Sequence, residues 1–290
     1  MISALRGYSE TEPQPPDAAM VMKTAEYLEA SNYGSGLARV KARVEVSRVT
    51  DSGKGYRDQL VVTPPESTEL PRPTTYPTLD VPKECNCYGL PVAQYTLMSN
   101  LCQSEFGGRD GSNACTLICI SLGLQFKKQK FSSLLSCTSL PLLWKNAIAN
   151  AIVDGNTLHD IAFKGQAINL DVEDAFENFE DELELAAYDE QQCHCPNQDL
   201  ANLVNLFTQS RVSDFQAGVI VVDGRTVSVL TSAQGEFVIV DTHGHSGNGA
   251  IIGVSNDIAS LLEWFKHTVH KHFNSAFRMC SLTWLTFKFE

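Results

Sequence analysis

The chain has 290 residues and a mass of 31.8 kDa, enough for one large or two modest domains. Its formal net charge of −12 argues against nucleic acid or an anionic membrane as the main partner and favours a partner with a basic face. The first residues hold no apolar signal segment, and the sequence contains no run of 18 apolar residues of the kind that crosses a membrane. The nine cysteines are an odd number, and a chain of this size does not need disulfides for stability, so reduced thiols are the simpler interpretation. We therefore expect an intracellular protein of the cytoplasm or nucleus.

Residues 1–82 differ in composition from the rest of the chain. They hold nine of the twelve prolines, which disfavour the interiors of helices and sheets. The pattern allows a short helix over 17–30 and a strand over 38–49. We therefore predict a Pro-rich, largely flexible tail or linker over 1–82 and one folded domain over 83–290.

A glycine-rich loop over 107–113 runs directly into an apolar segment that predicts a buried helix starting near Cys115. Ser112 or Asn113 is placed to cap this helix. The positive end of the helix dipole would then favour the thiolate form of Cys115, as suits a nucleophile. The alternative is a small apolar core residue, which is what we expect of Cys119.

The rest of the domain changes from a helical to a strand period along the chain. Helical patterns cover 141–153 and 157–187, the second of which turns acidic, and Asp199 can cap a helix to about residue 210. Strands follow at 217–222, 226–231, 236–241 and 250–254, with a hairpin turn at Asp223-Gly224. A helix over 258–273, capped within 255–257, and an edge strand over 280–289 complete the domain. Helices first and an antiparallel sheet second predict an α+β fold.

The strand ending at Asp241 leads into Asp241-Thr-His243. Residues two apart on a strand point to the same face, so the carboxylate would lie beside the imidazole and fix its tautomer. The alternative is an ordinary turn with an exposed histidine. Together with Cys115 upstream, however, the pattern favours a thiol nucleophile and its base. His159 and Asp160 form a rival pair in a helical segment without a strand partner.

The Cys115 helix, the hairpin that follows and Asp241-Thr-His243 resemble the deubiquitinase domain of the herpesvirus large tegument protein, one of the viral tegument-like deubiquitinases. The resemblance covers roughly residue 90 to the end of the chain and is firmest over 218–244. It implies a papain-like cysteine protease fold, with an N-terminal helical part followed by an antiparallel sheet. The family also has an oxyanion-stabilising glutamine about a dozen residues before the cysteine, where Gln103 stands here. The glycine-rich loop before the nucleophile departs from the family.

The resemblance implies a thiol-dependent ubiquitinyl hydrolase that cuts after the C-terminal glycine of ubiquitin. His243 would deprotonate Cys115, Asp241 would orient His243, and Gln103 with the Cys115 N–H would stabilise the oxyanion. The implied partners are ubiquitin or polyubiquitin chains, with no cofactor and no metal; the protein of a pathogen would act in the host cytosol. The alternatives are a catalytically silent ubiquitin-binding module and a papain-like hydrolase of another ubiquitin-like modifier.

Two possible metal sites compete with this interpretation. His245 shares a strand face with Asp241 and His243, but the sequence offers no fourth ligand. Cys85-Asn-Cys87 and Cys193-His-Cys195 are a second candidate, as joint ligands of one zinc ion, but their spacing differs from the usual two residues between zinc-binding cysteines. We therefore expect neither to bind a metal.

The stretch 171–190 holds ten carboxylates and no Lys or Arg. Either it is a solvated helix face, or it docks the basic face of ubiquitin. Glu177, Asp181 and Glu184 are spaced to share one face of a helix.

Overall fold

A computed structural model describes residues 43–47, 59–63, 81–195, 199–210, 215–274 and 279–289. The strands are β1 (Arg43–Ser47), β2 (Gln59–Thr63), β3 (Lys83–Glu84), β4 (Ala93–Thr96), β5 (Leu185–His194), β6 (Ala217–Val222), β7 (Arg225–Thr231), β8 (Phe237–Asp241), β9 (Ile251–Ser255) and β10 (Met279–Phe287). The helices are the short 3₁₀ helix η1 (Cys87–Gly89), α1 (Cys115–Gln129), α2 (Leu142–Phe163), α3 (Val172–Phe179), α4 (Ala201–Ser210) and α5 (Ile258–Phe273).

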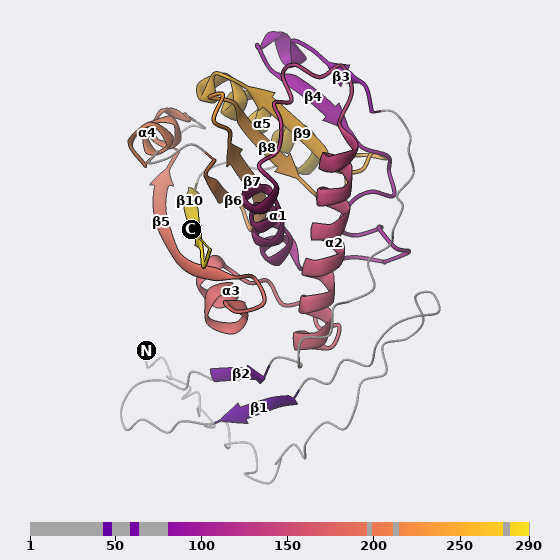
Figure 1. Cartoon of the computed structure of the whole chain (residues 1–290), viewed down its shortest axis with the longest axis vertical. Helices are drawn as coiled ribbons and strands as arrows, with labels where there is room; N and C mark the ends of the chain where they lie inside the picture. The colour runs from indigo at the N-terminus through magenta and orange to yellow at the C-terminus, as the bar shows by residue number, and fades with distance from the viewer. Residues whose placement is uncertain are drawn as a thin grey trace, which may run out of the picture.

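An antiparallel sheet of eight strands forms the centre of the molecule, in the order β3-β4-β9-β8-β7-β6-β10-β5 (Figure 1). The predicted α+β class is confirmed, as is the run of strands from β6 to β9. The hairpin between β6 and β7 turns at Asp223 and Gly224, which have φ angles of 46° and 75°. Two positive φ angles in succession are what a two-residue hairpin turn requires.

Helices cover both faces of the sheet. One hydrophobic core lies between the sheet and α1, α2 and α3, and a second lies between the sheet and α4 and α5. At Gly155 of α2, an added Cβ would lie 2.5 Å from the backbone nitrogen of Ile118 of α1. Only glycine allows this close approach, so α1 is held tightly between α2 and the sheet.

The acidic stretch is not one helix, contrary to the prediction. The helix predicted over 141–153 continues to Phe163 as α2, α3 ends at Phe179, and the segment from Leu185 becomes strand β5. β5 pairs with β10, so β10 lies inside the sheet and the prediction of an edge strand over 280–289 is also wrong. Pairing with a distant strand outweighs the helix propensity of Leu, Ala, Glu and Gln in β5.

The described residues cover only part of the segment for which the N-terminal predictions were made. The helix predicted over 17–30 lies outside them, whereas β1 falls within the predicted strand 38–49 and pairs with β2 in a separate two-stranded sheet. Val81 is buried in the first core, so the packed part of the chain includes this residue. The boundary at 82 and the flexible tail stay predictions. In the described ranges, no helix has both the length and the apolar character to cross a bilayer.

Candidate active site

Cys115 is the first residue of α1, as predicted, and its side chain is buried with 7% of the residue exposed. The predicted side-chain cap is wrong: Ala114 occupies the N-cap position, and Ser112 Oγ accepts a hydrogen bond from the Ala114 N–H at 3.1 Å instead. The first N–H groups of a helix have no acceptor within it, so the Cys115 N–H is available to a ligand.

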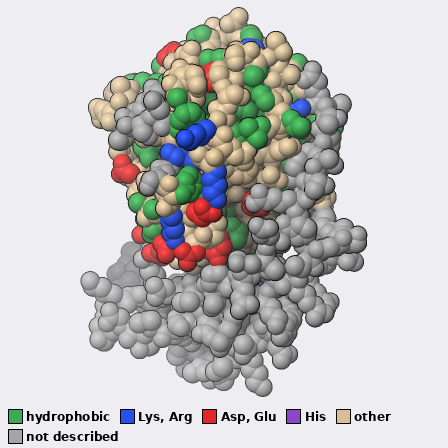
Figure 2. Space-filling model, viewed as in Figure 1, with side chains coloured by type: hydrophobic (Ala, Val, Ile, Leu, Met, Phe, Trp, Pro, Cys, Tyr) green, Lys and Arg blue, Asp and Glu red, His purple; other side chains and the backbone are tan. Residues whose placement is uncertain are grey.

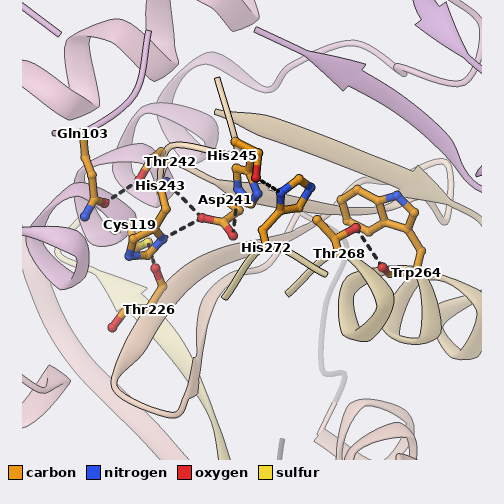
Figure 3. Close-up of polar contacts among 11 residues, drawn as sticks. Gln103, Cys119, Thr226, Asp241, Thr242, His243, His245, Trp264, Thr268 and His272 are labelled. Carbon is orange, nitrogen blue, oxygen red and sulfur yellow. Dashed lines mark hydrogen bonds and ion pairs between the residues drawn. The ribbon is translucent and has the colours of Figure 1, made fainter. Parts of the chain in front are cut away.

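Asp241 and His243 lie side by side where β8 ends, as the strand geometry predicted. Asp241 Oδ1 is 2.6 Å from His243 Nδ1 and also accepts a hydrogen bond from the His243 backbone N–H at 2.9 Å (Figure 3). Asp241 is fully buried. Because the carboxylate occupies Nδ1, the other ring nitrogen of His243 is the one that can exchange a proton with the thiol.

The charges at the site favour an ion pair between Cys115 and His243. Burial raises the pKa of the Cys115 thiol, but the hydrogen bond and charge of His243, with contacts from Thr226, lower that pKa from 9.0 to about 7. Burial lowers the pKa of His243, but the Asp241 carboxylate and Cys115 raise it to about 10. Burial raises the pKa of Asp241, and the two imidazoles of His243 and His245 reverse this and hold it well below its usual range. A thiolate beside an imidazolium is therefore well populated near neutral pH and predominates above it.

Thr226 of β7 forms a further wall of the thiol site, which the sequence did not indicate. Its backbone and hydroxyl both contact the Cys115 thiol, and its Oγ1 lies 3.0 Å from Thr116 Oγ1. Thr116 Oγ1 in turn donates a hydrogen bond to the Leu170 carbonyl at 2.6 Å. These contacts join α1, β7 and the segment before α3 around the nucleophile.

Gln103 lies beside the strand end that carries Asp241 and His243. Its backbone N–H donates to the Thr242 carbonyl at 2.8 Å, and its side-chain Oε1 accepts from Thr242 Oγ1 at 3.0 Å. From α2, Asn156 Nδ2 donates to the Gln103 carbonyl at 3.0 Å. Thr242 and Asn156 were not singled out from the sequence. Thr242 is the middle residue of the Asp241-Thr-His243 motif and Asn156 lies on a buried face of α2, but the contacts that give them a role join segments distant in the sequence.

A second imidazole contacts Asp241 from its other side. His245 Nε2 lies 3.2 Å from Asp241 Oδ2, and both side chains are 1% exposed. The His245 ring packs against the rings of His272 and Phe273 at the end of α5. A cavity of about 470 Å³ opens on this side of the site, lined by His245 and His272 but not by Cys115. Asp241 is thus held between two imidazoles.

The competing sites are not formed in the described part of the chain. There, no group of three or more His, Cys, Asp or Glu side chains is arranged to hold a metal ion. Among the rival bases, the His159 ring contacts the Ile168 carbonyl at 2.7 Å, and Asp160 pairs with Arg109. Both are engaged away from the thiol.

Comparisons with known proteins give a distant likeness to a solved structure. No family model matches the sequence, and no curated protein matches it significantly. Among solved structures, the chain is similar to the ubiquitin-specific protease encoded by murine cytomegalovirus tegument protein M48, which was solved in complex with a ubiquitin-based suicide substrate. The identity is 13% and the TM-score 0.43, over 65% of this chain and 84% of that one.

Proposed function

We propose that this chain is a cysteine protease of papain-like fold that removes ubiquitin from its conjugates. The observation that carries the proposal is the arrangement around Cys115. The thiol stands at the start of a buried helix with its pKa lowered to about 7, against an imidazole that a buried carboxylate holds in place. This is the arrangement that thiol acyl transfer needs.

In the proposed reaction, the Cys115 thiolate attacks the carbonyl carbon of the last glycine of ubiquitin. A C–S bond forms, and the π electrons of the carbonyl move to its oxygen, which Gln103 and the Cys115 N–H stabilise. When the intermediate collapses, the C–N bond breaks and the His243 imidazolium gives its proton to the leaving amine. Water then attacks the thioester and gives a proton to His243. The C–S bond breaks, which restores the thiolate and releases ubiquitin with a free C-terminal carboxyl group.

Ubiquitin is proposed as the substrate from the resemblance of the Cys115 and Asp241-Thr-His243 motifs and from the surface beside the nucleophile. Leu170, whose carbonyl binds Thr116, directly precedes Asp171, the N-cap of α3. Acidic side chains gather around α3, with Lys and Arg side chains beside them (Figure 2). A basic partner would meet this surface next to Cys115.

The test is a ubiquitin probe that carries an electrophile in place of its C-terminal carboxylate. The wild-type protein should form a covalent adduct with it, and peptide mapping should find the adduct on Cys115. Binding of ubiquitin without an adduct would instead indicate a silent ubiquitin-binding module. An adduct formed only with the probe of another ubiquitin-like modifier would support the other alternative.

The pH dependence of kcat/KM should be bell-shaped. The thiolate is the charged form, so activity should rise as pH passes the Cys115 pKa of about 7; the imidazolium loses its charge above the His243 pKa of about 10, so activity should fall there. In His243→Ala, the rate of iodoacetamide alkylation at Cys115 should titrate at higher pH, towards the ordinary value of 9.0. An unchanged titration in that variant would remove His243 from the thiol's environment.

The exposed carboxylates of α3 should speed the encounter with ubiquitin. The helical face first expected consisted of Glu177, Asp181 and Glu184, but Asp181 pairs with Lys288 and Glu184 with Lys128. The carboxylates to test are therefore Glu173 and Glu177, which lie one turn apart on α3. Changing both to Gln should raise KM or slow kon severalfold, leave kcat unchanged and flatten the salt dependence of kcat/KM.

The matched control for these charges is Glu263→Lys, which alters net charge by the same amount. Glu263 lies on α5, across the sheet from α3. This variant should keep the wild-type salt slope. Equal slopes in the wild type and the α3 double variant would show that α3 simply faces solvent.

A further inference from the structure

The side chain of Gln103 is held by one hydroxyl group. Thr242 Oγ1 donates to Gln103 Oε1 at 3.0 Å, and the Gln103 N–H donates to the Thr242 carbonyl at 2.8 Å (Figure 3). Thr242 is fully buried and Gln103 is 3% exposed. Thr242 stands between Asp241 and His243, and strand alternation turns its side chain away from theirs. The segment that sets the base therefore also fixes the glutamine.

The backbone of Gln103 is tied to the nucleophile from the opposite side. Asn156 Nδ2 donates to the Gln103 carbonyl at 3.0 Å, and Asn156 Oδ1 accepts from Ser112 Oγ at 2.6 Å. Ser112 Oγ accepts from the N–H of Ala114, the residue before Cys115, at 3.1 Å. This chain of hydrogen bonds fixes the backbone of Gln103 relative to the start of α1. What remains to be set is the rotation of the Gln103 amide.

An amide has two unlike ends, and only one of them can stabilise an oxyanion. A half-turn about the last side-chain bond exchanges the Nε2 donors for the Oε1 lone pairs. The Thr242 hydroxyl donates to Oε1 and so holds the side chain in the orientation that offers Nε2 to a substrate. Loss of this hydroxyl would remove the hydrogen bond that holds the Gln103 side-chain amide in that orientation.

We propose that Thr242 is a positioning residue, which orients the Gln103 amide so that its N–H groups meet the oxyanion on the acyl group attached to Cys115. This inference rests on the proposed thiol acyl transfer. It adds the residue whose hydrogen bond holds the amide with its donor end towards the developing charge. Because the charge on oxygen exists only in the intermediate and the transition states around it, the effect belongs to kcat and leaves KM unchanged.

Thr242→Val tests this directly, because valine keeps the shape of threonine and removes the hydroxyl. Its kcat on a ubiquitin substrate should fall about 10- to 100-fold, with KM within about twofold of wild type. Thr242→Ser keeps the hydroxyl and should recover kcat to within about threefold. If Thr242→Val keeps wild-type kcat, or Thr242→Ser loses as much as Thr242→Val, the proposal is overturned.

Thr283→Val is the matched control. Thr283 of β10 is also fully buried, and within the described structure its Oγ1 has no hydrogen-bond partner. The same substitution there removes a buried hydroxyl without removing a hydrogen bond. It should leave kcat at the wild-type value, so a loss in Thr242→Val cannot be ascribed to valine in the sheet as such.

A double-variant cycle separates orientation of Gln103 from general damage. If Thr242 acts through Gln103, adding Thr242→Val to Gln103→Ala should lower kcat by less than about twofold beyond Gln103→Ala alone. An equal loss in both backgrounds would show that Thr242 acts by another route and would overturn the proposal.

Acylation of Cys115 by p-nitrophenyl acetate, followed as the nitrophenolate burst, separates this inference from the substrate assignment. The small ester needs the oxyanion donors but no ubiquitin surface. If the wild type fails to cut ubiquitin while Thr242→Val slows the burst about 10-fold or more, the proposed function is wrong and the role of Thr242 stands. An unchanged burst rate in Thr242→Val overturns the role of Thr242 whatever the substrate.

Discussion

Cys115→Ala is expected to abolish ubiquitin hydrolysis, with a loss of at least about 10⁴-fold. Alanine has no nucleophile, so no thioester can form. The fold should survive, because alanine is the best helix former and Cys115 is a buried residue of α1. Circular dichroism and thermal unfolding should match the wild type to within a few degrees.

Cys119→Ala is the control for this experiment. Cys119 lies one turn further along α1, is fully buried and directs its Sγ to the Thr226 carbonyl at 3.4 Å. Burial raises the pKa of its thiol well above the ordinary value, so it stays protonated. Cys119→Ala should therefore label normally with the ubiquitin probe. Probe labelling of Cys115→Ala at the wild-type rate would remove Cys115 from the mechanism.

His243→Ala is expected to be nearly as damaging, with a loss of about 10³- to 10⁴-fold in kcat/KM. It removes the charge that lowers the Cys115 pKa and also the acid that protonates the leaving amine. Asp241→Ala should cost somewhat less, because the imidazole remains but loses its orientation. The double variant should be little worse than His243→Ala alone, since the two residues act as a unit.

His245→Ala tests which histidine is the base. His245 touches the far oxygen of Asp241, whereas His243 touches both Asp241 and Cys115. We therefore expect a smaller loss in His245→Ala than in His243→Ala. The reverse order, measured under the same conditions with both variants folded, would mean that the base has been assigned to the wrong imidazole.

The parts of this molecule that could be predicted from its sequence are those whose signals are local. The turn at Asp223-Gly224 and the apolar strands on either side of it define the centre of the sheet. The alternation of a strand places Asp241 beside His243, and the change from a glycine-rich loop to an apolar run places Cys115 at a helix start. Each of these depends on residues close together in the chain.

What could not be predicted depends on contacts between distant segments. Thr226 reaches α1 across 110 residues, and Thr242 reaches Gln103 across 139. The same holds for β5, which is a strand because β10 is beside it. The acidic stretch contains no Lys or Arg, yet Lys128 and Lys288 neutralise two of its carboxylates from elsewhere in the chain.

The assembly of the site from separate segments makes the reactivity of Cys115 a property of the folded state. An unfolded or newly synthesised chain carries an ordinary thiol, of which only a few per cent is thiolate at pH 7. The lowered pKa appears only when β7 and the end of β8 have docked against α1. The Cys115 thiol is thus less reactive before the chain has folded, and its alkylation rate reports the completion of folding.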